Sequence, residues 1–496
     1  AGEICTCGIA FLCDAQMDEV ILAEELRDSK WVPKSEIAQV ITNQAVVKDI
    51  EKAGLTSSFD LDDFGKVDLF IEPKNGHVLD PANHLDEVCD VYVKEGKVAC
   101  VGSLSSDKIP DECTVIDAEG KYVMPGLVDL HVHLREPGFE YKETIYSGTH
   151  AMAKGGFTAV CPMPNTKPVT DSPAMIEKIL KIAKTDSPIR VYPVGAVTKG
   201  QLGEEMTDIA GMVKAGAKAI SEDGKSVMNA EIYREAMKEA KKAGIPVLAH
   251  CEDKNMVGHG AMNAGEKAKE LGICGITNAV EDVIVARDIL LAKETGVHLH
   301  LCHCSTKDSV KMVRIAKKDG VSVSAEVCPH HFAMTEDEIA GDDANYKMNP
   351  PLRSAADVEA LVDGLADGTM EAISTDHAPH GEEEKKQSIA KAPFGIVGSE
   401  TAYALSVTHL VKTGKLTPLQ LVEKMSTNPC RILSVPGGTL SVGASADITI
   451  ADMDSEYVID KNTFLSKGKN TPFDGAKVNG RVYYTIVGGN IVYQYE

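Results

Sequence analysis

Between residues 121 and 436, short apolar segments alternate regularly with amphipathic ones, and this alternation constrains the fold more than any other feature. The eight apolar segments read VMPGLVDLHVHL, FTAVCPMPN, IRVYPVGAVT, AKAISEDG, IPVLAHCED, VHLHLCHCS, VSVSAEVCPHH and MEAISTDHAPH. Strands that are apolar on both faces and separated by helices indicate a parallel sheet. Eight such units in a row predict a closed (β/α)₈ TIM barrel. An open doubly wound sheet is the alternative, but no GxGxxG turn follows the first strand.

The segments on either side of this barrel have other patterns. Residues 67–120 and 437–496 contain alternating apolar and polar positions, with Asn-Gly and Glu-Gly turn signals in the first segment. We expect these two flanks to form one small β-sandwich domain built from both ends of the chain. Residues 1–66 are acidic, and their patterns over 17–28 and 34–54 predict a helical N-terminal extension. The sequence does not decide the role of this extension.

Composition excludes several classes of partner. The net charge of −23 argues against nucleic acid and anionic membranes. No apolar run reaches the roughly 18 residues of a membrane span, and no basic segment precedes the first apolar stretch, so we expect no signal peptide. Thirteen cysteines are scattered, several of them inside apolar strands, which indicates reduced thiols. We therefore expect a cytoplasmic protein with a small-molecule substrate.

Polar side chains end the predicted strands, and the first strand shows this most clearly. Side chains at positions i, i+2 and i+4 of a strand share one face, so His131, His133 and Arg135 point the same way. Two imidazoles so placed chelate a borderline metal such as zinc, and the guanidinium beside them suits a carboxylate. An exposed strand with incidental histidines is the alternative for an isolated His-x-His.

Further candidate ligands end the later strands. They are Asp223 in SEDG, His250 in AHCED, His303 in CHCST and Asp376 in STDHAPH. A TIM barrel places its active site at this end of its strands. Polar groups buried there without partners would each cost about 1–3 kcal/mol. A dinuclear site bridged by a carboxylate explains all of them together.

In this order, the motifs HVHLREPG, MPNT, SEDG, AHCED, CHCST and STDHAPH resemble the amidohydrolase superfamily, and specifically the class I dihydroorotases. The resemblance extends over about residues 67–496. It implies two zinc ions per chain. His131, His133 and Asp376 would bind the first ion, and His250 and His303 the second.

The bridging ligand is the point at which superfamily members differ. Many of them use a carbamylated lysine on the fourth strand, whereas class I dihydroorotases are similar to this chain in having an aspartate before glycine. Lys218 has the opposite strand parity from Asp223, so the two side chains face opposite sides of the strand. Ser221 occupies the position where the lysine of hydantoinases is expected. We therefore expect Asp223 to be the bridge, and we assign no role to Glu222.

The resemblance also implies a substrate, dihydroorotate, which is a cyclic amide with a carboxylate. The residues expected to contact it are Arg135, Asn165, Asn349, His380, Phe394 and Gly395. Arg135, Asn165 and His380 would bind the carboxylate, and Asn349 would hydrogen-bond the ring. Ordinary turn and loop positions are the alternative for Asn165 and Asn349. Arg353, in the same loop as Asn349, is expected to be a surface charge.

The implied activity is the reversible cyclisation of N-carbamoyl-L-aspartate to L-dihydroorotate and water in pyrimidine (UMP) biosynthesis. Asp376 would be the catalytic residue that accepts and returns the proton. A related cyclic amidase (a hydantoinase, dihydropyrimidinase or allantoinase) is one alternative, but it would leave Arg135 and His380 without a purpose. A non-catalytic dihydroorotase-like subunit is another, and it would be expected to lack ligands that this chain has. A homodimer and an aspartate transcarbamoylase partner are the assemblies that we consider.

Overall fold

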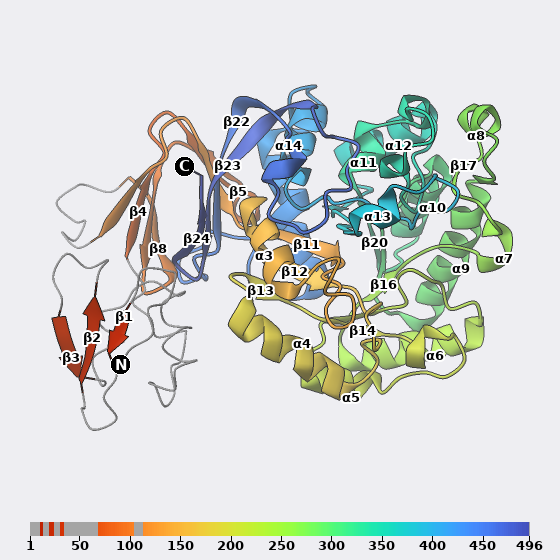
Figure 1. Ribbon diagram of the computed structural model, residues 1–496, viewed down its shortest axis with the longest axis horizontal. Coiled ribbons are helices and arrows are strands. Elements are labelled where there is room, and N and C mark those ends of the chain that lie inside the picture. Colours follow the sequence, from red (N-terminus) through yellow and green to blue (C-terminus); the bar gives the residue numbers. More distant parts are fainter. Residues whose placement is uncertain (1–9, 13–18, 24–29, 34–67, 104–112, 496) are drawn as a thin grey trace. The chain divides into compact units, whose positions relative to one another are not determined.

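The computed structural model describes residues 68–103 and 113–495 in full, together with three short strands nearer the N-terminus (Figure 1). The chain divides into two units, Ala1–Val67 and Asp68–Glu496. Within the described residues, no helix combines the length and the apolar character that crossing a membrane requires.

The N-terminal unit contains strands where the sequence predicted a helix. These are β1 (Ala10–Leu12), β2 (Glu19–Ala23) and β3 (Lys30–Pro33), which form an antiparallel sheet in this order. The helix predicted over 17–28 is therefore wrong at β2, where Val20 pairs with Val32. The β-branched residues Val20 and Ile21 favour strands, and pairing with a partner strand overrides a short helical pattern. The helix predicted over 34–54 lies outside the described residues.

Two sheets of the second unit contain the strands that flank its central part, and the larger of them combines strands from both ends of the unit. The larger has the order β24-β23-β22-β10-β5-β6 and comprises β5 (His77–Asp80), β6 (Leu85–Glu87), β10 (Tyr122–Pro125), β22 (Ile448–Val458), β23 (Lys477–Val487) and β24 (Asn490–Gln494). The smaller has the order β8-β7-β4-β9 and comprises β4 (Leu69–Glu72), β7 (Asp90–Lys94), β8 (Lys97–Gly102) and β9 (Thr114–Asp117). The two sheets share one apolar cluster, to which Ile71, Val123 and Ile450 contribute.

The central part of the chain is α/β with parallel strands, as the sequence predicts. One sheet contains β11 (Leu127–Val132), β12 (Phe157–Pro162) and β13 (Arg190–Val191). The other contains β14 (Val194–Ala196), β15 (Ala219–Ser221), β16 (Val247–Ala249), β19 (Leu299–Leu301), β20 (Val323–Val327) and β21 (Ala372–Ile373). Only Tyr192 and Pro193 separate β13 from β14. A parallel bridge between Val132 and His377 joins the end of β11 to the segment after β21.

Helices connect these strands. They include α3 (Ile145–Lys154), α4 (Pro173–Asp186), α5 (Ile209–Ala215), α6 (Ala230–Ala243), α9 (Ala279–Thr295), α10 (Lys307–Lys318) and α12 (Ala355–Ala366). The helix α6 buries Tyr233, Ala236, Met237 and Ala240, one helical face, and ends at the left-handed Gly244. Figure 1 shows α4, α5 and α6 along the outside of the strands.

Shorter elements lie in the connections after the strands. They are α7 (Lys254–Val257), β17 (Met262–Asn263), α8 (Glu266–Leu271), β18 (Gly275–Ile276), α11 (Pro329–Ala333) and α13 (Glu382–Lys385). The chain then forms α14 (Ala402–Ser406), α15 (Pro418–Val422) and α16 (Asn428–Leu433) before it returns to β22.

Phe157 tests how tightly the central core is packed. Its side chain begins β12 and is fully buried in the largest apolar cluster. We expect Phe157→Ala to lower the free energy of unfolding by about 3–5 kcal/mol, because it leaves a cavity. Val115→Ala, on the exposed face of β9, is the matched control and should change it by less than about 0.5 kcal/mol. Urea denaturation followed by circular dichroism measures both, and equal shifts would contradict the packing described.

Candidate metal centre

The six predicted metal ligands come from the ends of five strands and meet in one place. His131 belongs to β11 and His133 follows it, while the others follow β15, β16, β19 and β21: Asp223, His250, His303 and Asp376. All six side chains are buried. Because parallel strands end at the same rim, residues far apart in sequence are brought within contact distance there.

Asp223 lies between the histidines. Its Oδ1 atom is 3.1 Å from Nε2 of His131, 3.4 Å from Nδ1 of His250 and 3.7 Å from Nε2 of His303. Its Oδ2 atom is 3.5 Å from Nε2 of His133. Two groups of potential ligand atoms, His131–His133–Asp223 and Asp223–His250–His303, therefore share one carboxylate. This is the arrangement that a two-metal site requires.

Asp376 approaches the first of these groups. Its Oδ1 atom is 3.1 Å from Nε2 of His133 and 3.5 Å from Nε2 of His131. Burial alone would raise the pKa of Asp376, but the two imidazoles hold it below its ordinary value. For Asp223, burial again raises the pKa and the surrounding imidazoles lower it, and the pKa lies well below its ordinary value. Both carboxylates are therefore ionised.

The donor set fits divalent metal ions. Nε2 of His131 and Nε2 of His250 are buried without a hydrogen-bond partner. Nε2 of His131 lies 3.1 Å from Oδ1 of Asp223, but this contact lacks hydrogen-bond geometry. A buried polar atom without a partner costs about 1–3 kcal/mol. Imidazole nitrogens and carboxylate oxygens are ligands that zinc prefers, and a bound cation would satisfy these atoms.

Three residues at this rim have a left-handed backbone conformation. Arg135, His303 and Asp376 have φ values of 62°, 34° and 49°. Side chains other than glycine rarely adopt this left-handed region, and such residues gather at functional sites. The strain lies at the points where three strands turn into the site.

Glu326 is a buried residue of the site that the sequence analysis missed. Its carboxylate oxygens lie 3.1 Å from Nδ1 of His131 and 2.9 Å from Nε2 of His300, and it accepts a 3.2 Å bond from the backbone N–H of His303. A carboxylate on the second ring nitrogen of a metal-binding histidine fixes its tautomer and orientation. The signal was a lone glutamate inside the apolar strand β20.

Two further side chains hold the ligand-bearing segments. Asp129 accepts bonds of 3.0 Å and 3.2 Å from the backbone N–H groups of His131 and Thr375, and burial raises its pKa to about 7. Asn165 lies 2.9 Å from Nδ1 of His133 and 3.4 Å from Oδ2 of Asp223. The structure thus places Asn165 against the metal ligands, and its contact with substrate stays a prediction.

Arg135 and His380 lie together beside the centre, as the sequence suggests. Nη2 of Arg135 is 3.3 Å from Nε2 of His380, which is also 2.7 Å from the carbonyl oxygen of Phe394. Nδ1 of His380 is 3.2 Å from Nζ of Lys142, a cation that the sequence analysis missed. Burial, Arg135, Lys142 and Lys385 lower the pKa of His380 to about 2, so this imidazole is neutral. It donates from Nε2 to Phe394 and accepts at Nδ1 from Lys142.

Gly395 packs directly against this basic group. Its φ is +127°, and a Cβ atom there would lie 2.6 Å from Cβ of Ala378 and 3.1 Å from Nε2 of His380, so only glycine fits. Asn470 donates to the carbonyl oxygens of Gly395 and Ala378 at 3.0 Å and 3.1 Å. The Phe394-Gly395 segment is thereby fixed beside Arg135 and His380.

In the loop that carries Asn349 and Arg353, the burial of Arg353 differs from the prediction. Nδ2 of Asn349 donates to the carboxylate of Glu252. The expectation that Arg353 is a surface charge is wrong, since only 2% of its surface is exposed. Its guanidinium donates to the carbonyl oxygen of Ile276 at 2.8 Å and to Oδ1 of Asn263 at 2.9 Å. These partners come from a distant connection, so burial of Arg353 could not be predicted from its own loop.

Comparison with known proteins agrees with this geometry. A family described as Dihydro-orotase-like matches residues 120–309. The dihydroorotase of Pelotomaculum thermopropionicum is 51% identical over 421 residues, which cover 85% of this chain and 98% of that protein. The dihydroorotase of Staphylococcus aureus is 52% identical over 380 residues, covering 77% and 90%. The chain belongs to the dihydroorotase family.

Solved structures extend the likeness to other cyclic amidases. The L-hydantoinase (dihydropyrimidinase) of Arthrobacter aurescens aligns with a TM-score of 0.75 and 28% identity, covering 86% of this chain and 96% of its own. The dihydropyrimidinase of Brevibacillus agri aligns with a TM-score of 0.74 at 22% identity, over 86% and 95%, and shares the fold. The dihydroorotase family is metal-dependent, and this member has the histidine and carboxylate groups that metal binding needs.

Glu326→Gln tests the role of the buried glutamate in this dihydroorotase-family site. The amide cannot hold His131 and His300 as the carboxylate does, so we expect metal affinity to fall about 10- to 100-fold. Glu222→Gln is the matched control, because Glu222 is also buried and is next to Asp223 in the chain, but accepts from the backbone N–H of Thr198. Competition with a chromophoric chelator measures both affinities. Equal losses in the two variants would show that Glu326 does not act through His131.

Proposed function

We propose that this chain is a dihydroorotase that interconverts N-carbamoyl-L-aspartate and L-dihydroorotate in pyrimidine biosynthesis. The observation that carries the proposal is the buried Asp223 between two pairs of histidines, with Arg135 beside them. Dihydroorotases that are about half identical to this chain over nearly their whole length support the proposal. An aspartate at the centre argues against the hydantoinase alternative, for which we expected a lysine on the fourth strand.

We also propose that the parallel strands form a closed (β/α)₈ barrel within residues 121–436. The strand order and the bridge between Val132 and His377 support closure. The sandwich of residues 67–120 and 437–496 would be a second domain. A homodimer and docking to an aspartate transcarbamoylase stay predictions. The acidic residues 1–66 are the segment that we consider for contact with the transcarbamoylase.

We propose two zinc ions as the resident metals. His131, His133 and Asp376 would hold one, and His250 and His303 the other, with Asp223 on both. Bound zinc polarises a carbonyl oxygen and lowers the pKa of water. The ligand geometry that supports this assignment is the sharing of Asp223 by two donor groups.

The chain's own side chains supply the proton transfer and the orientation of substrate. Asp376 is ionised and lies at the rim, so it accepts the proton of the attacking water and delivers it to the ring nitrogen that leaves. In cyclisation the same carboxylate removes the proton from the carbamoyl nitrogen. Arg135 binds the substrate carboxylate, which a guanidinium does with paired hydrogen bonds. The neutral His380 holds Phe394 beside that carboxylate.

Asp376→Asn tests the proton-transfer role. An amide cannot accept the proton, so we expect kcat to fall by at least about 10²- to 10⁴-fold. Assays with dihydroorotate at alkaline pH and carbamoyl-aspartate at acid pH, each with added zinc, measure both directions. The exposed Asp319→Asn is the control. Near-normal turnover of Asp376→Asn in the zinc-loaded enzyme would exclude this mechanism.

Arg135→Gln tests recognition of the substrate carboxylate. Loss of a charged hydrogen-bonding partner is expected to lower kcat/KM for dihydroorotate about 10- to 100-fold, mainly through KM. The more exposed Arg314→Gln serves as the control.

Wild-type enzyme is also assayed with hydantoin and allantoin, which lack this carboxylate. Faster turnover of either compound than of dihydroorotate would favour the cyclic amidase alternative.

A further inference from the structure

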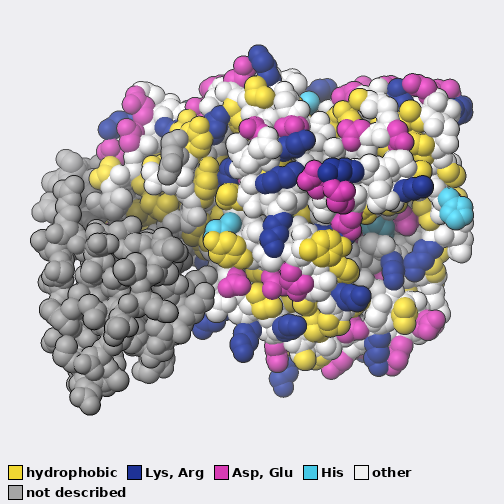
Figure 2. All heavy atoms as spheres, in the orientation of Figure 1, with side chains coloured by type: hydrophobic (Ala, Val, Ile, Leu, Met, Phe, Trp, Pro, Cys, Tyr) yellow, Lys and Arg dark blue, Asp and Glu magenta, His cyan; other side chains and the backbone are white. Residues whose placement is uncertain are grey.

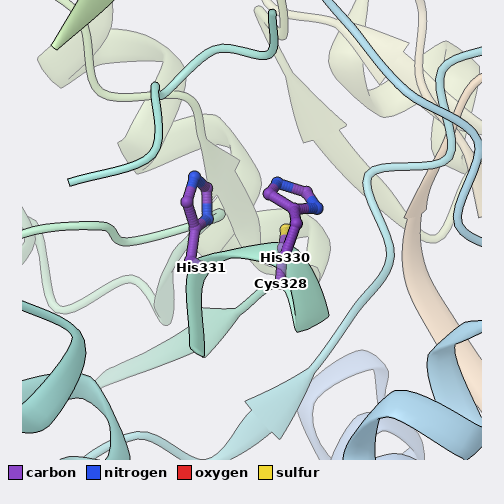
Figure 3. Close-up of side chains that lie close together, drawn as sticks. All are labelled: Cys328, His330 and His331. Atoms are coloured by element: carbon purple, nitrogen blue, oxygen red, sulfur yellow. The ribbon is translucent and has the colours of Figure 1, made fainter. Parts of the chain in front are cut away.

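Three potential metal ligands outside the Asp223 centre lie in one turn of the chain. Cys328 precedes α11, and His330 and His331 lie within it. Their ligand atoms lie within 4.8 Å of one another, and all three side chains are buried. Figure 3 shows the two imidazoles side by side, with a ring nitrogen of each directed toward the other and the sulfur of Cys328 near His330. The reaction proposed above uses none of them.

The hydrogen bonding of His331 leaves one nitrogen without a partner. Burial lowers its pKa well below the ordinary value, so the ring is neutral and carries one N–H. Nε2 lies 2.9 Å from the carbonyl oxygen of Pro350, which can only accept, so Nε2 holds the proton. Nδ1 then presents a lone pair, and it is buried with no hydrogen-bond partner. A metal-binding histidine typically donates its other N–H to a carbonyl in this way.

His330 and Cys328 complete a set of unsatisfied donors. Nε2 of His330 is buried without a partner, and burial lowers the pKa of this ring to about 4. Burial raises the pKa of the Cys328 thiol well above its ordinary value, and no hydrogen bond from its sulfur is found within the described part of the chain. Leaving the two imidazole nitrogens unpaired costs about 1–3 kcal/mol each, which a shared cation would remove.

We propose that Cys328, His330 and His331 bind a divalent cation of the zinc class, separate from the Asp223 centre. One thiolate and two neutral imidazoles are the ligands that zinc and cobalt(II) prefer, and solvent can fill a fourth position. Binding breaks the S–H bond of Cys328 and forms a sulfur–metal bond, and the proton passes to solvent. His331 would then connect the cation to Pro350, next to Asn349.

Cobalt(II) is the probe that tests this site. The enzyme is stripped with a chelator and reloaded with cobalt, and its near-ultraviolet absorption and cobalt content are measured. The Asp223 centre offers only nitrogen and oxygen ligands, so a thiolate-to-cobalt charge-transfer band reports a cysteine ligand. We expect this band in the wild type. We expect Cys328→Ser to lose the band and about one equivalent of cobalt per chain.

Two further variants make the result specific. Cys302→Ser is the matched control, since Cys302 is also buried and lies with His131 and Glu326 in another group of possible ligands. It should keep the band. His330→Gln keeps the thiol and should still lose about one equivalent of cobalt, while its circular dichroism stays that of the wild type. Absence of the band in the wild type, its persistence in Cys328→Ser, or its loss in Cys302→Ser instead would overturn the proposal.

Discussion

The buried carboxylate of Asp223 is the constraint on which the site depends. Ionised groups are rarely buried unless oppositely charged partners or metal ions surround them, and the carboxylate of Asp223 contacts imidazoles and Asn165. The sheet register produces this arrangement. Ser221 pairs with Leu248, so Asp223 and His250 each follow two residues later on neighbouring strands. A shift by one residue would turn one of them away from the centre.

The position of a polar residue after an apolar strand was sufficient to predict the six candidate ligands, whose side chains lie together in the structure. It also predicted the parallel α/β core, because buried strands and amphipathic helices have distinct sequence patterns. Glu326 was missed because it lies within a strand, and its partners His131 and His300 belong to other strands. Burial of Arg353 depends on Asn263 and Ile276 in the same way. The prediction of an N-terminal helix was wrong at β2, where pairing with β3 decided the conformation.

The site has an anionic part and a cationic part. Asp223 and Asp376 face the imidazoles, while Arg135 and Lys142 lie on the two nitrogens of His380. Burial and these cations lower the pKa of His380 and keep it neutral, so its imidazole orients the segment at Phe394 and adds no charge. Burial also lowers the pKa of Arg135 to about 10, which leaves it charged at neutral pH. A substrate with a cyclic amide and a carboxylate fits both parts at once, whereas a neutral cyclic amide would leave the half-buried guanidinium of Arg135 without a carboxylate partner.

The strand β20 connects these parts to the Cys328–His331 turn. Glu326 fixes His131 from within this strand, and Cys328 follows two residues later at its end. The turn then contacts the loop at Pro350 through His331. A cation in the turn would therefore act on the position of Asn349 in that loop and supply no group to the reacting atoms. Because the two groups of ligands differ in sulfur content, the metal at each can be distinguished by its spectrum in the same molecule.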